Sequence, residues 1–359
     1  MAPVDVLIIT ALKMEHDAAL SSLVRVGALM APCDEDTWCP YLEGTLPTKA
    51  RPLVVALARP TRMGATATAP IAGALSERLL PQCLAMCGVC AGNPADVALG
   101  DVIVAECTYT YDEGKRTDKR FEPDHRQIPV GDKWLRAAQE IVVDGLPSYG
   151  PPSPQDCQIW LLSQLAARAD PRKHPARDRY LGGEKWTLVS SELESKGLIR
   201  RKDQSFAITD AGRDALNGYL AYTIESPTRL PFAVRPGPMA SGNTVVKDGL
   251  TWEALTTWGV RTAIGLEMEA ATIAQTAQRL GIPHWLVAKG VMDYANPKKD
   301  DRMKRFAARA SADILIHLLQ TVPLESARAG GSSGGGVNVI GNVVGSDLNI
   351  TQIVGSSKS

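Results

Sequence analysis

Five continuous apolar runs, each short enough for a single strand, set the strongest constraint on the fold of this 359-residue chain. They read VDVLIIT (4–10), PLVVALA (52–58), CLAMCGVCAG (83–92), GDVIVAECTYTY (100–111) and HWLVAKGVMD (284–293). Runs of this kind, without polar alternation, are typical of strands buried on both faces. Segments with helical spacing of apolar residues occur at 11–24, 66–80, about 267–280 and 302–320. This alternation predicts an α/β fold whose mostly parallel sheet is covered on both faces.

The segment from about 150 to 230 interrupts this pattern. It begins at the breaker YGPPSP and ends at SPTRLP. Its centre predicts a helix, two short strands joined by a polar turn at 202–204, and a second helix, an order that resembles winged-helix domains. The segment carries 12 basic against 10 acidic residues, and its would-be recognition helix contains Glu192 and Glu194. Because these acids have the wrong sign for DNA, we favour a protein-interaction or site-covering role, while the basic wing at 200–202 keeps nucleic-acid contact open.

The C-terminal residues form two further segments. Residues 326–336 have the composition of a flexible glycine-serine linker, and residues 337–359 are β-prone, almost uncharged and free of proline. That composition is typical of cross-β segments, and it resembles the amyloid signalling motifs of effectors whose partners are NACHT or NB-ARC receptors. An unstructured tail or a single edge strand is an equal alternative.

The overall composition excludes several classes of protein. Lysine plus arginine equals aspartate plus glutamate, so no global field attracts nucleic acid or anionic lipid. No run approaches the roughly 20 apolar residues of a membrane span, and Asp5 interrupts the first apolar run, so a cytoplasmic location is expected. The seven cysteines lack the paired spacing of a zinc site, so we expect buried thiols, no metal and no cofactor.

Acidic residues recur where the predicted strands end. Glu15 lies just beyond the first run, Asp293 follows the last one directly, and Glu267 and Glu269 enter a predicted helix. Ligands of open parallel sheets bind outside the carboxyl ends of the strands, so Glu15 and Asp293 are placed where a site is expected. Two residues apart on a helix correspond to about 200° of rotation, so Glu267 and Glu269 cannot serve the same face. An acid in a first helical turn is also favoured by the helix dipole alone, so each acid taken singly has a structural alternative.

Five motifs in order give these acids a context. They are TALKMEHDAAL, CGVCAGNPADVALGDVIVAE, PGPMASGNTVVKDG, IGLEMEAATIA and AKGVMDYANPKKDDR. Together they resemble the nucleoside phosphorylase and nucleosidase superfamily, in particular methylthioadenosine/S-adenosylhomocysteine nucleosidases and similar domains of NACHT and NB-ARC proteins. The resemblance covers residues 1–146 and 231–325 as two parts of one domain, and it implies a three-layer fold with a mixed central sheet, interrupted by the insertion at 150–230.

The resemblance implies a role for each acid. Glu15 matches the acid that activates water, Asp293 the acid that protonates the purine at N7, and Glu269 the acid that binds the ribose hydroxyls, with Met268 packing on the sugar. Cleavage of an N-glycosidic bond builds oxocarbenium character on the sugar, so it needs a base for water, an acid for the leaving group and a carboxylate that orients the sugar. Glu267 is expected to support the start of the helix.

Further substrate-binding candidates come from the same motifs. Gly88, Ala91 and Gly92 match the family's glycine turn, and Ser241 and Gly242 match the strand end beside the base. An ordinary turn is the alternative for these glycines. Where the family often has an aromatic residue that stacks on the base, this chain has Thr244, Val245 and Val246, and Val245 is retained as a substrate contact.

Basic residues near these motifs are candidate phosphate ligands. They are Arg62, Lys247 and Lys289, together with Lys298 and Lys299. If they line one rim, AMP or ATP becomes a candidate substrate; the alternative is solvated surface side chains. Lys289 and Gly290 also replace the arginine and small residue that the family usually has before the catalytic aspartate. The N-terminal arginine motif of hexameric phosphorylases is absent, which favours hydrolysis over phosphorolysis.

The sequence therefore predicts a purine nucleosidase, acting on an adenine nucleoside or nucleotide, as the effector of a bacterial antiphage defence or signalling pathway. The resemblance also implies a homodimer or higher homo-oligomer, and a NACHT- or NB-ARC-type partner is expected to bind residues 337–355. Nucleic acid and membranes are not expected partners. Two alternatives remain open: a phosphorolytic nucleoside phosphorylase, and a non-catalytic nucleoside sensor with a winged-helix output on DNA.

Overall fold

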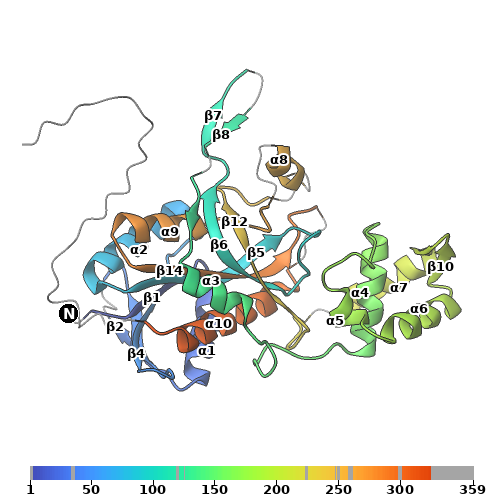
Figure 1. Cartoon of the computed structure of the whole chain (residues 1–359), viewed down its shortest axis with the longest axis horizontal. Coiled ribbons are helices and arrows are strands. Elements are labelled where there is room, and N and C mark those ends of the chain that lie inside the picture. The colour runs from blue at the N-terminus through green and yellow to red at the C-terminus, as the bar shows by residue number, and fades with distance from the viewer. Residues whose placement is uncertain are drawn as a thin grey trace, which may run out of the picture.

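A ten-stranded mixed sheet forms the centre of the computed structural model (Figure 1). The structure describes residues 3–33, 37–118, 121–124, 126–222, 225–246, 248, 251–257, 262–297 and 301–324. The strands of the sheet are β1 (Val6–Ile9), β2 (Leu29–Cys33), β3 (Tyr41–Leu46), β4 (Leu53–Ala58), β5 (Cys83–Gly92), β6 (Val102–Thr110), β9 (Ile128–Pro129), β12 (Val234–Ser241), β13 (Gly265–Glu267) and β14 (His284–Asp293). The five apolar runs of the sequence are β1, β4, β5, β6 and β14, which confirms the predicted strands and the predicted fold class.

Five strands at one end of the sheet form a closed ring. The order is β13-β12-β6-β14-β5-β1-β4-β3-β2, with β9 paired to β6. Strands β4, β1, β5 and β14 are parallel, so their carboxyl ends meet at one edge. β14 is antiparallel to β6, and β13 pairs both with β12 and, in antiparallel fashion, with β5. This last pairing closes β5, β14, β6, β12 and β13 into a ring. The hairpin of β2 and β3 extends the other end of the sheet and is not evident from the sequence pattern.

Helices cover both faces of the sheet, as predicted (Figure 1). α2 (Ala65–Leu79) and α9 (Ala270–Arg279) lie on one face, and α1 (Lys13–Arg25), α3 (Asp132–Gln139) and α10 (Lys304–Thr321) lie on the other. The main apolar core runs through these layers, and β1 is completely buried within it. The helix expected from about residue 267 begins only at Ala270, because residues 265–267 pair with β12 and β5 as β13.

Residues 154–222 form a second apolar core beside the sheet (Figure 1). Their elements are α4 (Pro154–Ala166), α5 (Arg177–Leu181), α6 (Lys185–Ser195), β10 (Ile199–Lys202), β11 (Ser205–Ile208) and α7 (Asp210–Tyr222). β10 and β11 make a separate two-stranded antiparallel sheet. The helix, hairpin and helix expected here are present, whereas the likeness to a winged helix and the exact domain boundaries stay predictions.

The remaining elements lie near the carboxyl ends of β6 and β12. They are the hairpin of β7 (Gly114–Arg116) and β8 (Phe121–Pro123), and α8 (Thr251–Thr257). The predicted linker and tail (326–359), together with Lys247, Lys298 and Lys299, lie outside the described residues.

Two general expectations concern cysteines and membranes. Five of the seven cysteines are buried, as predicted, and burial raises the pKa of the Cys83 and Cys87 thiols to about 12, which makes them poor nucleophiles. Within the described ranges, no helix is long and apolar enough to cross a membrane.

Candidate active site

A cavity of about 260 Å³ lies where β1, β5, β13 and β14 end. Five of the predicted site residues line it: Glu15, Ala91, Val245, Met268 and Glu269. The other described lining residues are Ala11, Leu12, Met63, Val89, Cys90, Tyr111, Thr244, Val246, Leu266, Glu267, Met292, Asp301 and Lys304. The edge expected from strand polarity is therefore the edge that carries the cavity.

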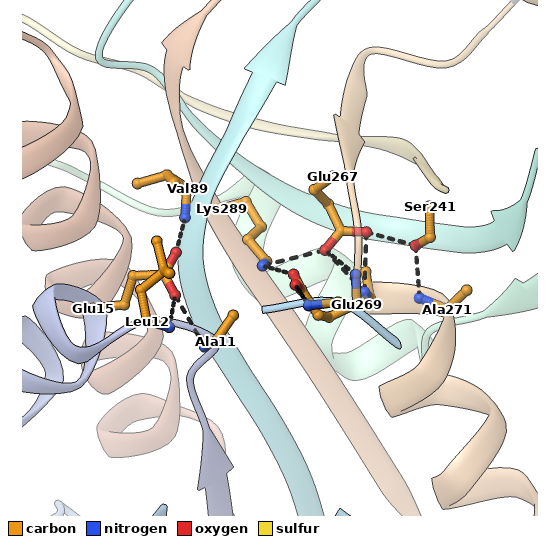
Figure 2. Close-up of polar contacts among 11 residues, drawn as sticks. Ala11, Leu12, Glu15, Val89, Ser241, Glu267, Glu269, Ala271 and Lys289 are labelled. Atoms are coloured by element: carbon orange, nitrogen blue, oxygen red, sulfur yellow. Dashed lines mark hydrogen bonds and ion pairs between the residues drawn. The ribbon is translucent and has the colours of Figure 1, made fainter. Parts of the chain in front are cut away.

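Glu15 is fixed by backbone donors from two segments (Figure 2). Its Oε2 accepts hydrogen bonds from the N–H groups of Ala11 and Leu12, at 3.0 and 2.9 Å, and so binds the backbone that precedes α1. Its Oε1 accepts from Val89 N at 2.8 Å, which ties the carboxylate to β5. The residue is only 2% exposed. A carboxylate has about four acceptor sites, so these three bonds leave one site, on Oε1, for a ligand or water.

Gly88 allows this close approach. A Cβ at residue 88 would lie 2.4 Å from Glu15 Oε1 and 2.7 Å from its Cδ, so a side chain there would displace the carboxylate. The family resemblance suggested a glycine turn at 88–92, but these residues are part of strand β5. Gly92 has a different neighbourhood, because a Cβ there would overlap the side chains of Val97 and Val291. Glycine at these two positions therefore leaves room for neighbouring protein side chains: Glu15 at Gly88, and Val97 and Val291 at Gly92.

Glu267 organises the start of α9 from the end of β13 (Figure 2). Its Oε2 accepts from the N–H groups of Glu269 and Ala270, both at 2.9 Å, as a helix cap would. Its Oε1 accepts from Ser241 Oγ at 2.5 Å, and the same hydroxyl accepts from Ala271 N at 2.8 Å. The expectation that Glu267 supports the helix start is confirmed. Ser241 contacts Glu267 and α9 and is not among the described residues that line the cavity.

Glu269 is the N-cap residue of α9 and is 4% exposed. Its Oε1 accepts from Gly64 N at 2.7 Å, and its Oε2 lies 3.3 Å from Lys289 Nζ. Burial raises the pKa of Glu269, with further contributions from the charges of Glu267 and Glu15; Lys289 and the Gly64 N–H act in the opposite direction. The prediction that Glu267 and Glu269 cannot serve the same face is wrong, because Glu267 lies on β13 and Glu269 is the N-cap of α9, and both line the cavity.

Lys289 lies beside the two glutamates (Figure 2). It is 1% exposed, and its Nζ is 3.2 Å from Glu267 Oε2 and 3.3 Å from Glu269 Oε2. Burial acts to lower the pKa of Lys289, but the charges of Glu267, Glu269 and Glu15 outweigh burial and leave it above the usual value. The expectation that Lys289 lines a basic rim is therefore wrong: its ammonium is enclosed and shared by two carboxylates. No local sequence pattern indicates this pairing, because Lys289 lies on β14, a different strand from Glu267.

Asp293 ends β14 beside the cavity. It is 4% exposed, and its Oδ1 accepts from Ala295 N at 2.8 Å. Its neighbour Met292 and its register partner Ala91 both line the cavity, whereas Asp293 is absent from the described lining. The predicted acid thus follows a lining residue, Met292, in the sequence, but is not itself among the described residues that line the cavity.

Tyr111 supplies an aromatic wall that the sequence reasoning missed. It follows β6 directly, lines the cavity and is 6% exposed. A Cβ at Gly242 would lie 2.3 Å from the Tyr111 ring, so this glycine lets the ring lie against the end of β12. The signal was present, because Tyr111 closes the apolar run 100–111. Val245 lines the cavity as expected and is half exposed.

The two described candidate phosphate ligands, Arg62 and Lys289, are absent from the described lining of the cavity. Arg62 is exposed and next to the lining residue Met63, but it does not itself belong to the described lining. Lys304, at the start of α10, does line the cavity together with Asp301, and neither residue was predicted. Within the described ranges, no group of three or more His, Cys, Asp and Glu residues is arranged to hold a metal ion.

Comparison with known proteins identifies the fold. No family model matches the sequence. The chain is 25% identical over 261 residues to the uncharacterized protein y4jS of Sinorhizobium fredii, covering 71% of this chain and 47% of that protein, so the chain spans about half of its relative's length.

Several solved structures resemble the chain more completely. The methylthioadenosine/S-adenosylhomocysteine nucleosidase of Helicobacter pylori has a TM-score of 0.53 at 13% identity, covering 89% of this chain and 99% of that one. The futalosine hydrolase of H. pylori has a TM-score of 0.53 at 13% identity, with 88% and 97% covered. The Neisseria meningitidis nucleosidase in complex with methylthio-immucillin-A has 0.52 at 15% identity, with 88% and 98% covered. The chain therefore has the mixed α/β fold of these nucleosidases.

Proposed function

We propose that this chain hydrolyses the N-glycosidic bond of a purine nucleoside or nucleotide, with adenine as the base. The observation that carries the proposal is that Glu15 and Glu269 line one cavity, together with Met268 and Glu267, in a fold shared with known nucleosidases. These residues come from opposite ends of the chain, so their convergence on a cavity is more informative than either motif alone.

In the proposed mechanism, Glu269 binds the sugar. Each of its oxygens has one protein partner, Gly64 N or Lys289 Nζ, which leaves an acceptor site on each for two neighbouring hydroxyls. Met268 provides an apolar surface for the ring beside them. Because the carboxylate is buried and cannot reorient, it holds the sugar in place while positive charge develops at C1′.

Glu15 and Asp293 transfer the two protons. Glu15 takes a proton from water at its remaining Oε1 site as the water oxygen bonds to C1′. The C1′–N9 bond breaks, its electron pair goes to the base, and Asp293 donates a proton to the base at N7. The products are the free purine and the sugar with a hydroxyl at C1′.

The charges of the cavity support water rather than phosphate as the nucleophile. Among the described lining residues, four carry carboxylates and only Lys304 carries a positive charge. A phosphate dianion beside Glu15 and Glu269 would meet like charges at close range, whereas water would not. Lys304, whose backbone N–H donates to Asp301 O, is the cation of this described lining.

The wider role remains part of the same proposal. We place the chain as a homo-oligomeric effector in antiphage defence or signalling, with residues 337–355 recruiting a NACHT- or NB-ARC-type partner and the segment 150–230 acting as an interaction module. A peptide of residues 337–355 should form thioflavin-positive fibres, and a peptide that stays monomeric at high concentration would rule out this recruitment mode.

Release of free base tests the catalytic proposal. The purified full-length protein is incubated with adenosine, AMP, ATP and methylthioadenosine, and free adenine is measured with and without inorganic phosphate. We expect base release from at least one substrate without added phosphate, strongly reduced in Glu15→Gln and unchanged in Glu77→Gln, whose side chain is exposed on α2. If no base is released although Glu15→Gln and wild type bind a nucleoside equally, the chain is a sensor and not an enzyme; strict phosphate dependence would make it a phosphorylase.

A further inference from the structure

The end of β14, which carries Asp293, pairs with β5 on one side, but on its other side it is held by a turn and not by strand β6. Pairing of β14 with β6 ends at Gly290, opposite Val102. Beyond that point Val291 N donates to Asp101 O, and Gly100 N donates to Val291 O, both at 2.8 Å.

The same turn contacts the residue on the other side of Asp293. Leu99 N donates to the hydroxyl of Tyr294 at 3.2 Å. The turn at 98–101 therefore binds β14 both before and after Asp293.

The carboxylate of Asp101 shapes this turn. Its Oδ2 accepts from Ala98 N at 2.9 Å, and its Oδ1 accepts from Ala233 N at 2.8 Å. Asp101 is completely buried, so its charge requires a cation nearby.

The cation comes from the segment 150–230. Arg179, on α5, places one nitrogen, NH2, 2.7 Å from Asp101 Oδ1 and 3.0 Å from Oδ2. Its side chain is 17% exposed, so the pair is shielded from water and is stronger than a surface ion pair.

Two further contacts fix Arg179 and the turn to each other. Tyr180, the next residue, stacks on Trp160 with ring centroids 5.3 Å apart, which anchors α5 on α4. Ala98, at the start of the turn, belongs to the apolar core of the segment 154–222 rather than to the main core. The turn is thus packed by this segment on one side and bonded to β14 on the other.

We propose that Arg179 is a positioning residue for the reaction: through Asp101 and the 98–101 turn, the inserted segment holds the end of β14 so that Asp293 reaches the leaving base. This inference rests on the proposed function for the role of Asp293. It gives the insertion a function within the active site, and its physical basis is that small displacements of a catalytic group cost large factors in rate.

The test compares variants of two arginines on the same helix. Arg179→Ala removes the contact to Asp101. Arg179→Lys restores a single nitrogen that can reach both carboxylate oxygens. Arg177→Ala is the control, because Arg177 pairs with the exposed Asp178 and lies over Trp186, both within the segment. Because Arg179→Ala leaves a buried charge and can fail to fold, the neutral pair Arg179→Met with Asp101→Asn is made as well.

Two measurements are made on the full-length protein. The first is kcat and KM for base release. We expect kcat to fall about 10- to 100-fold in Arg179→Ala and in the neutral pair, with KM unchanged, and to recover in Arg179→Lys. The second is hydrogen exchange of the backbone at 288–296, which we expect to accelerate in the same two variants and to stay as in wild type in Arg177→Ala.

The two measurements separate the possible failures. Faster exchange with unchanged kcat in an active enzyme would overturn the positioning role, as would a rise in KM alone or an equal effect of Arg177→Ala. If the wild-type protein releases no base, the proposed function fails. Hydrogen exchange then tests the structural part of the inference alone. Exchange at 288–296 that is as slow in the Arg179 variants as in wild type would show that the insertion does not hold the end of β14.

Discussion

The buried carboxylates at the cavity and the buried carboxylate of Asp313, between α1 and α10, differ in how completely the protein satisfies them. Asp313 Oδ1 accepts from Ser22 Oγ at 2.6 Å and Arg25 NH1 at 2.8 Å. Its Oδ2 accepts from the hydroxyl and the N–H of Ser148, at 2.7 and 3.2 Å, so all four acceptor sites are used.

Two of the cavity acids, Glu15 and Glu269, are left incomplete by comparison. Glu15 has three partners and Glu269 has two, and both face the cavity. Burial and charge are common to both regions, so neither property by itself marks a functional acid. The difference is an acceptor site that the protein leaves unused at the wall of a cavity.

The largest expected effect is on activity, in which variants of Glu15 and Asp313 should differ most. Glu15→Gln should lower kcat for base release by a factor of about 10² to 10⁴, because the amide cannot take the proton of water. Asp313→Asn should keep the wild-type kcat per folded molecule and lose about 1–3 kcal/mol of unfolding free energy, because its bonds are purely structural. Kinetics and urea unfolding of both variants provide the measurement. Equal losses of kcat in the two variants would contradict the distinction.

The next effect concerns Lys289, the cation that contacts both Glu267 and Glu269. Lys289→Met leaves Glu267 and Glu269 buried without their ammonium, and we expect a loss of about 3–5 kcal/mol in the free energy of unfolding. Lys304→Met is the control, because Lys304 is only half buried at the cavity; its change should stay within about 0.5 kcal/mol. A Lys289→Met protein as stable as wild type would show that the glutamates do not need this charge.

A smaller effect tests the contact between Gly88 and Glu15. Gly88→Ala places a methyl group on the Glu15 carboxylate, so we expect kcat to fall about 10- to 100-fold as the carboxylate moves. Gly73→Ala, in α2, meets no atom within 4 Å and should stabilise the protein by about 0.5–1 kcal/mol without changing kcat. Unchanged kcat in Gly88→Ala would mean that the position of Glu15 is not critical.

The smallest effect is a pH dependence of stability. The pKa of Glu269 is raised in the folded state, so its protonated form is favoured by folding. Its contribution to the free energy of unfolding is therefore fully present below the ordinary glutamate pKa, and it is lost as the pH rises through the raised pKa. The Glu269→Gln variant lacks this loss, so its free energy of unfolding should increase relative to that of wild type as the pH rises above the ordinary glutamate pKa of about 4. Thermal unfolding across this range measures the difference. Parallel curves for the two proteins would contradict a raised pKa.

Local sequence patterns predicted the elements that their own residues determine. The five buried runs became strands because continuous β-branched and small apolar side chains suit a sheet covered on both faces. The same patterns placed Glu15 and Asp293 at strand ends, since a strand end can be located from the apolar run itself, and placed Glu269 at the start of a helix. The three-residue strand β13 carries too little periodicity to be distinguished from the helix that follows it, which was expected to begin at about residue 267.

What the sequence by itself determined is therefore the order of strands and helices and the edge at which the acids gather. Tertiary structure alone decided which of those acids are satisfied and which face the cavity. Gly88 meets Glu15, Lys289 joins Glu267 to Glu269, and Arg179 reaches Asp101 across 78 residues of chain. The physical reason is that such contacts form between segments distant in sequence, where no local periodicity records them, and only the packing of strands and turns sets the distances.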